Sequence, residues 1–254
     1  MDEYTINICE KHGEYKAYLF KFGASSMCSG CPECEKERAI EEEEKRKVEE
    51  ERGRISWNRK HNIEEEYDNA TLQNIEILTP EHERAVKYAK EIIADRRGKL
   101  VLLGANGTGK THIAISVVKE LNGKIFSMYE IGARIRASYV SGAKETELDI
   151  VDELARLPIL VIDEIGRTKG SDAETNWLSY IIDKRHVRHL PIILISNKHL
   201  NKTCEYRNTP QKGCKDCLEN YISEDIMSRL SEDGYLVTFK EGDYRKIKRT
   251  RNIV

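Results

Sequence analysis

A glycine-rich motif, Gly104–Thr111, restricts the folds open to this chain more than any other feature. It fits the pattern G-x-x-x-x-G-K-[ST] in full, between an apolar segment at 99–103 and a helical segment that begins at Thr111. Loops of this kind join a buried strand to a helix and hold phosphate groups. Their backbone N–H groups turn toward the phosphate oxygens, and the helix N-terminus adds positive potential. The alternative, a chance glycine-rich turn, is disfavoured by the strand and helix on either side.

The side chains of the motif predict a nucleoside triphosphate site with a magnesium ion. Lys110 would reach the terminal phosphates, and the Thr111 hydroxyl would bind magnesium. The predicted nucleotide-binding residues are Gly104, Asn106, Gly107, Thr108, Gly109, Lys110 and Thr111, together with Asp163 from a second motif.

That second motif is an acidic pair, Asp163-Glu164, which ends the apolar segment 159–162. In a doubly wound sheet, ligands bind at the carboxyl ends of the strands, so the pair should face the phosphate loop. Asp163 would hold magnesium, and Glu164 would orient and deprotonate a water for attack on the γ-phosphate. The alternative is an ordinary acidic helix start after a core strand.

A polar amide, Asn197, follows the apolar segment 192–196 and could sense the γ-phosphate or the attacking water. The run Asn197-Lys198-His199-Leu200 begins like the guanine-reading motif N-K-x-D, but leucine stands where that motif needs aspartate. The base is therefore predicted to be adenine, and the substrate ATP.

Apolar segments alternate with helical ones from residue 99 onward, which is typical of an α/β fold with a parallel sheet. Thr79 and Pro80 predict the start of a helix that runs to about Arg97. Hydrophobic residues make up 39% of the chain and charged residues 34%, enough for one core under a very polar surface. The predicted strands are 99–103, 124–128, 159–162, 192–196 and 235–239.

Composition divides the chain into three parts. Residues 1–34 are rich in cysteine, histidine and glycine, and residues 35–66 form a charged linker. A solvent-exposed helix is expected over 35–54, ended by Gly53 and Ser56–Asn58. Residues 67–254 have the texture of a globular domain, with a cysteine-containing insertion at about 201–220.

The chain has seven cysteines in two groups, and no signal peptide is recognisable, so metal binding or free thiols are expected rather than disulfides. In the first group, Cys9-x-x-His12 and Cys31-x-x-Cys34 predict one structural zinc ion, with no open coordination position for catalysis. Cys28 could replace one ligand, because Cys28-x-x-Cys31 has the same spacing.

The second group lacks an obvious fourth ligand, so a second zinc ion and three reduced thiols remain equal alternatives. Its cysteines are Cys204, Cys214 and Cys217, and His199 is the nearest candidate for the missing ligand.

The net charge of −2 gives no overall attraction for nucleic acid or anionic lipid. A basic tail, Arg245–Arg251, is either solubilising or in contact with phosphate. We expect a cytoplasmic protein without membrane contact, because no apolar run approaches the length of a spanning helix.

Together these motifs resemble the AAA+ ATPases of the DnaC/DnaI helicase-loader group, which includes the IstB transposition helper. The resemblance covers residues from about Tyr67 to Arg245. Besides the phosphate loop it rests on Tyr67–Thr71, Ile162–Gly166, Ile181–Arg185, Ile195–Asn197, Ile226–Leu230 and Phe239–Arg245. One departure is Glu164, since the group usually has two aspartates at the acidic pair.

The resemblance implies further roles. Arg229 would be an arginine finger that reaches a neighbouring subunit's nucleotide, so the protein would form a homo-oligomer. Arg245 would be the second sensor, and the nine residues after it are too few for a full C-terminal helical lid. The predicted catalytic residues are thus Glu164, Asn197, Arg229 and Arg245.

By the same resemblance, the N-terminal zinc module would grip the replicative DNA helicase, and the ATPase core would engage single-stranded DNA. Arg134, Arg136, Tyr139 and Lys144 could contact that strand, unless they belong to an ordinary amphipathic surface helix. The predicted function is ATP-dependent loading of the replicative helicase during replication initiation. The alternatives are a transposition-helper ATPase and a nucleotide-gated adaptor with negligible hydrolysis, and Glu164 argues against the adaptor.

Overall fold

The structure is a computed structural model, and it describes residues 4–22, 25–167, 172–200, 204, 214 and 216–240. The chain divides into two compact units, residues 1–57 and residues 58–254. The division falls inside the charged segment expected to be a linker. Each unit is described by itself.

The first unit begins with a three-stranded antiparallel sheet. Its strands are β1 (Tyr4–Cys9), β2 (Gly13–Phe22) and β3 (Ser25–Cys28). At the β1–β2 turn Cys9 pairs with Gly13, whose φ of 77° is left-handed and suits glycine. The turn therefore places His12 next to the end of β1.

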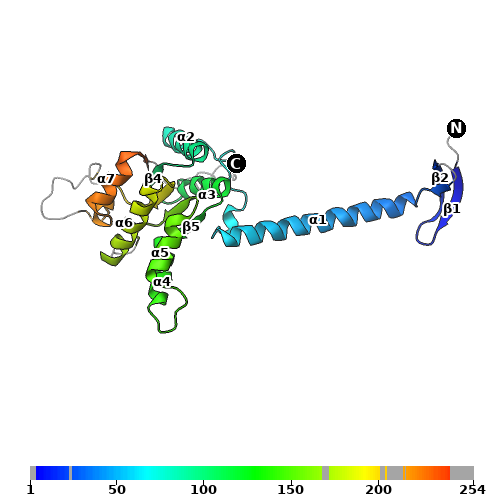
Figure 1. Cartoon of the computed structure of the whole chain (residues 1–254). Coiled ribbons are helices and arrows are strands. Elements are labelled where there is room, and N and C mark those ends of the chain that lie inside the picture. The colour runs from blue at the N-terminus through cyan, green and yellow to red at the C-terminus, as the bar shows by residue number, and fades with distance from the viewer. Residues whose placement is uncertain are drawn as a thin grey trace. The chain divides into compact units, whose positions relative to one another are not determined.

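Helix α1 (Pro32–Lys60) follows the sheet (Figure 1). Its sequence is polar on all sides. Ion pairs one turn apart stabilise it, as between Glu41 and Lys45 (2.8 Å). The prediction that Gly53 and Ser56–Asn58 end this helix is wrong, because α1 continues through them to Lys60. One glycine costs a helix only about 1 kcal/mol, and the buried Asn58 side chain is held by a hydrogen bond to Asp68.

The second unit contains the predicted parallel sheet, and its five strands confirm the α/β expectation. The strand order is β5-β6-β7-β4-β8, with every neighbouring pair parallel. The phosphate loop follows β4, the acidic pair follows β6, and β7 lies between these two strands. The strands are β4 (Lys99–Gly104), β5 (Lys124–Ser127), β6 (Leu160–Asp163), β7 (Ile192–Ser196) and β8 (Gly234–Phe239).

Among the described residues of the second unit, helices α2 to α7 lie around this sheet (Figure 1). Helix α2 starts as predicted, with Thr79 at the N-cap and Pro80 at the first helical position. Short 3-10 turns occur at Glu65–Tyr67 (η1) and Leu218–Asn220 (η3). The helices are α2 (Pro80–Asp95), α3 (Lys110–Leu121), α4 (Met128–Ser138), α5 (Glu147–Arg156), α6 (Asp172–Val187) and α7 (Glu224–Glu232).

Both faces of the sheet are buried, as expected for parallel strands covered by helices. On one face, alternate residues of β4, β6 and β7 form a core cluster with side chains from α4, α5, α6 and α7. The other residues of these strands are also buried, and α2 and α3 contact β4 and β6 respectively. Rigid packing on both faces therefore fixes the loops at the carboxyl ends of the strands.

A buried arginine joins α5 to the start of β7. The Arg185 guanidinium donates to the carbonyl oxygens of Leu154 (3.0 Å), Leu157 (2.9 Å) and Pro191. Its side chain is fully buried, and this burial lowers the pKa of Arg185 to about 9. Arg185 thus supplies hydrogen-bond donors to carbonyl groups in the interior of the unit.

Among the residues that the structure describes, no helix combines the length and the apolar character that crossing a membrane requires.

Candidate nucleotide site and metal-ligand clusters

The phosphate loop leaves β4 at Gly104 and enters α3 at Lys110. Gly104 has a φ of 134°, and a Cβ atom there would lie 2.6 Å from the carbonyl oxygen of Phe239. Only glycine therefore lets β4 pass β8 and turn into the loop. Gly109 caps α3 with a left-handed φ of 78°, which leaves the first N–H groups of the helix directed at the loop.

Lys110 is buried and contacts three oxygen atoms of the loop. Its Nζ donates to the carbonyl oxygens of Gly104 (2.8 Å) and Ala105 (2.6 Å), and to Thr108 Oγ1 (3.2 Å). The ammonium group therefore lies within the loop itself, where the loop motif requires the charge that meets phosphate oxygens.

The phosphate loop and the acidic pair meet directly, because Thr111 Oγ1 donates to Asp163 Oδ2 over 2.9 Å. Burial raises the pKa of the Asp163 carboxyl above its ordinary value, while the hydrogen bonds from Thr111 and the Glu164 N–H oppose the rise. A hydroxyl and a carboxylate at this spacing are the oxygen ligands that Mg²⁺ binds beside substrate phosphates. The donor set therefore fits magnesium.

Glu164 has an unusual backbone conformation, with a φ of 59°. Its N–H donates to Asp163 Oδ1 over 2.6 Å, and its carboxylate forms an ion pair with Arg167. A non-glycine residue in the left-handed region costs about 1–3 kcal/mol and is typical of functional sites. Glu164 thus follows Asp163 at the same sheet edge, and its negative charge acts on the Asp163 carboxyl.

The end of β7 is fastened to the loop that carries the acidic pair. Ser196 Oγ donates to the Ile165 carbonyl over 2.6 Å, and the Ile165 N–H donates to the Ile195 carbonyl over 3.0 Å. Asn197 is exposed directly after this junction. The structure thus brings Asn197 to the edge that holds Lys110, Thr111 and Asp163.

Of the two arginines predicted to be catalytic, the structure describes Arg229 but not Arg245. Arg229 lies on α7, and its Nε forms an ion pair with Asp183 Oδ1 of α6 at 2.7 Å. Figure 1 shows α6 and α7 side by side. Arg245 lies outside the described residues.

Two of the side chains predicted to contact DNA form ion pairs or hydrogen bonds with glutamates of this chain. Arg134 pairs with Glu145 (2.6 Å) and Glu153 (2.5 Å), and the Tyr139 hydroxyl donates to Glu147. These contacts favour the surface-helix interpretation for Arg134 and Tyr139.

Four ligands of the N-terminal cysteine group lie together. Cys9, His12, Cys31 and Cys34 have all their ligand atoms within 4.8 Å of one another. His12 Nδ1 lies 3.3 Å from Cys34 Sγ and 3.7 Å from both Cys9 Sγ and Cys31 Sγ. A tetrahedral zinc ion separates such ligand atoms by roughly 3.5–3.8 Å. The donor set therefore fits zinc, whereas Cys28 is exposed and outside the cluster.

A carboxylate outside this cluster was not predicted from the sequence. Glu37 Oε1 lies 3.2 Å from His12 Nε2, the ring nitrogen that faces away from the thiols. Metal-bound histidines usually donate their second N–H to a carboxylate, which fixes the ring. The signal available in the sequence is spacing, because Glu37 follows Cys34 by three residues on the same face of α1.

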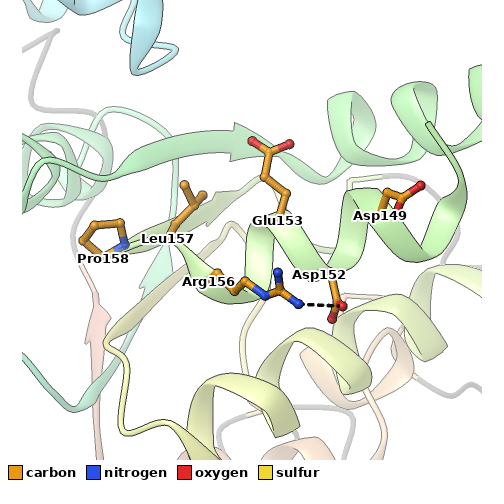
Figure 2. Close-up of a pocket in the computed structure, with 6 residues that line it drawn as sticks. All are labelled: Asp149, Asp152, Glu153, Arg156, Leu157 and Pro158. Carbon is orange, nitrogen blue, oxygen red and sulfur yellow. Dashed lines mark hydrogen bonds and ion pairs between the residues drawn. The ribbon is translucent and has the colours of Figure 1, made fainter. Parts of the chain in front are cut away.

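The surface pocket of Figure 2 lies away from the nucleotide site, along α5 and the turn before β6. Asp149, Asp152 and Glu153 line it, and Arg156 pairs with Asp152 at 3.2 Å. Its carboxylates would repel phosphate groups, so the pocket is not a second nucleotide site.

The sheet order, the phosphate loop and the Thr111–Asp163 contact define a phosphate-loop ATP-binding domain of the AAA+ type. More particularly, the chain belongs to the family described as IstB-like ATP binding protein, whose profile matches residues 35–251. This family includes insertion-sequence ATP-binding proteins and DnaC helicase loaders, so the resemblance found in the sequence is confirmed.

Two relatives illustrate this range. The ATP-binding protein of insertion sequence IS5376 from Geobacillus stearothermophilus is 34% identical over 156 residues, which are 59% of this chain and 57% of that protein. The replicative helicase loader DnaC of Buchnera aphidicola (subspecies Baizongia pistaciae) is 26% identical over 193 residues, 72% of each chain. The match therefore spans little more than half the length of the first relative.

Solved structures share the fold. A DnaC helicase loader superposes with a TM-score of 0.56 at 21% identity, covering 70% of this chain and 100% of that one. DnaI gives 0.52 at 20% identity, with 69% and 94% covered. The replication initiator DnaA, bound to AMPPCP and single-stranded DNA, gives 0.54 at 17% identity, with 72% and 55% covered.

Proposed function

We propose that this chain hydrolyses ATP and loads the replicative DNA helicase onto single-stranded DNA, acting together with copies of itself. The contact between Thr111 and Asp163, with Glu164 adjacent, is the observation that carries the hydrolytic part. The contact joins the phosphate-binding motif to the proposed magnesium ligand Asp163. The next residue, Glu164, supplies a carboxylate that can activate water, which a site for binding alone does not need.

The roles of the individual residues follow from their chemistry. Lys110 and the N–H groups at the start of α3 bind the β- and γ-phosphates of ATP. Thr111 and Asp163 would hold Mg²⁺, which when bound would offset negative charge on the phosphate oxygens. Glu164 orients the attacking water and accepts its proton, and Asn197 donates a hydrogen bond to the water or the γ-phosphate.

Arg229 completes the site of a neighbouring copy in this proposal. It would stabilise the charge on the transferred phosphoryl group, a role worth a factor of about 10³–10⁵ in turnover. A monomer would therefore bind ATP and hydrolyse it slowly. Arg245 would serve as the second sensor.

Residues 1–34 are proposed to be a zinc module that binds the helicase, with 35–66 as its helical linker and 67–254 as the ATPase domain. The cluster of Cys9, His12, Cys31 and Cys34 supports the module. The match to a DnaC loader over 72% of the chain supports the helicase as partner and the cytoplasm as location.

A transposition-helper ATPase is the second candidate, favoured by the 34% identity to the IS5376 protein. It would use the same hydrolytic residues on duplex DNA with a transposase as partner. The cysteine cluster favours the loader, because ATP hydrolysis itself does not require such a module, whereas binding of a helicase could use it.

The test combines the full chain with the replicative helicase of its own organism. The mass of the complex and the rate of phosphate release are measured for the wild type, Arg229→Ala and Cys31→Ser, with single-stranded or duplex DNA. Arg229→Ala should bind ATP and the helicase but lose hydrolysis, whereas Cys31→Ser should bind ATP and lose the helicase. Lys110→Ala should not bind ATP, and its rate of phosphate release serves as the baseline.

A wild type that ignores the helicase and is stimulated by duplex DNA would replace the loader by the transposition helper. Negligible hydrolysis under every condition, with ATP bound, would replace both by the nucleotide-gated adaptor.

A further inference from the structure

A second cluster of metal ligands lies in the ATPase unit. His199, Cys204, Cys214 and Cys217 each place a ligand atom within 4.8 Å of the other three. His199 Nε2 lies 3.3 Å from Cys214 Sγ and 3.5 Å from Cys217 Sγ. These separations match the roughly 3.5 Å expected between nitrogen and sulfur on a tetrahedral zinc ion. We propose that this cluster binds a second, structural zinc ion through three thiolates and one imidazole.

The backbone brings two of the ligands together without the metal. His199 and Cys217 form a parallel bridge, in which the His199 N–H donates to the Asp216 carbonyl (3.0 Å) and the Leu218 N–H donates to the His199 carbonyl (2.8 Å). Leu200 and Leu218, which follow these ligands, are buried in the core cluster. One half of the site is therefore fixed by the fold.

The other half has the form of a zinc knuckle. Cys214 and Cys217 are separated by two residues, and the Asp216 N–H donates to Cys214 Sγ over 3.4 Å. Asn220 Nδ2 donates to the Cys214 carbonyl over 2.6 Å and holds the turn from the far side. Cys204 and Cys217 are both buried, and their Sγ atoms lie within 4.8 Å of each other.

The chemistry of the ligands selects zinc. Three thiolates and one imidazole suit a tetrahedral, borderline-soft ion, and no ligand position remains open for catalysis. Hard cations such as Mg²⁺ prefer oxygen ligands and would not compete for this set. The site is separate from the cluster at Cys9, because its four ligands all come from residues 199–217.

The position of the site indicates what the ion stabilises. His199 follows Asn197 at the end of β7, and Cys217 is followed by η3, Tyr221 and then α7. Lys198 Nζ lies 4.9 Å from the centre of the Tyr221 ring and pairs with Asp216 at 2.7 Å. The ion would therefore connect the end of β7 to the segment that leads into α7. Any effect of this ion on ATP hydrolysis rests on the proposed function. The binding of zinc to the four ligands does not depend on that function.

The experiment counts zinc in the purified full-length chain by elemental analysis after dialysis against a weak chelator. The wild type should hold two zinc ions per chain. Cys214→Ser should hold one, and Cys31→Ser/Cys34→Ser should also hold one. Cys28→Ser, which changes an exposed cysteine outside both clusters, is the matched control and should keep two.

Replacement of zinc by Co²⁺ supplies a second readout that does not depend on Cys214→Ser folding. The Cys31→Ser/Cys34→Ser variant should bind one Co²⁺ and show the intense visible absorption of a tetrahedral thiolate complex. Only one zinc ion in the wild type, with none in this double variant, would refute the second site. If the wild type holds both zinc ions but does not hydrolyse ATP, the proposed function is refuted and the second zinc site stands.

Discussion

The ion pair between Arg229 and Asp183 leads to a quantitative prediction about assembly. If Arg229 contacts the nucleotide of a neighbouring copy, its ion pair with Asp183 must first break. Asp183→Asn removes the charge that holds Arg229 and keeps the size of the side chain. We therefore expect the variant to reach its active assembly at lower protein concentration than the wild type.

The size of the effect follows from exposure. The side chains of Arg229 and Asp183 are 40% and 43% exposed, so water screens their attraction. Pairs of this kind contribute about 0.2–1 kcal/mol, which corresponds to a factor of about 1.4 to 5 in an equilibrium constant. The rate of phosphate release per chain should rise by a factor in that range at subsaturating protein, and should be unchanged at saturation.

The assay measures phosphate release against protein concentration, with self-association followed by analytical ultracentrifugation. Glu41→Gln breaks the exposed ion pair with Lys45 on α1 and is the matched control, expected to leave both curves unchanged. Arg229→Ala should lower turnover by about 10³-fold or more. If Asp183→Asn lowers the rate of phosphate release by more than tenfold, the reasoning is refuted. Asp183 would then be needed to position Arg229 for hydrolysis.

Three further variants test the fold and the site. Arg185→Met removes the donor to three carbonyl groups, two of them buried, and should lower the free energy of unfolding by about 3 kcal/mol or more in urea titrations; a change below about 1 kcal/mol would contradict this role. Glu164→Gln should bind ATP with the wild-type affinity but turn over at least about 10²-fold more slowly in single-turnover assays, and equal rates would exclude Glu164 as the base. Gly104→Ala should abolish binding of a fluorescent ATP analogue, because the added Cβ meets the carbonyl of Phe239 at 2.6 Å; retained binding would show that β8 can move away.

The parallel sheet and the nucleotide edge could be predicted because their signals are local. Apolar runs mark the strands, and the motifs after them fall at one edge whenever the strands are parallel. The contact between Thr111 and Asp163 follows from this rule although 51 residues separate them. Exact strand ends differ from the prediction by one residue, as at Leu160 and Gly234.

Features that depend on tertiary contacts could not be predicted. The weak helix preference of Gly53 suggested an end to α1, but the hydrogen bond of Asn58 to Asp68 forms only in the folded chain. The pairing of Arg229 with Asp183 requires α6 and α7 to be neighbours. The fourth ligand of the second cysteine cluster was uncertain for the same reason, because a backbone bridge between distant segments brings His199 to Cys217.

The left-handed backbone at Glu164 places stability and turnover in opposition during evolution. Glycine, asparagine or aspartate tolerates this conformation better than glutamate does, so replacements that remove the long carboxylate should yield a more stable chain. Glycine or asparagine at position 164 would also remove the carboxylate that accepts the proton of the attacking water, so selection for folding alone would favour chains that bind ATP and hydrolyse it slowly. Aspartate would relieve the backbone and still keep a carboxylate, so it is the one replacement that does not set stability against turnover.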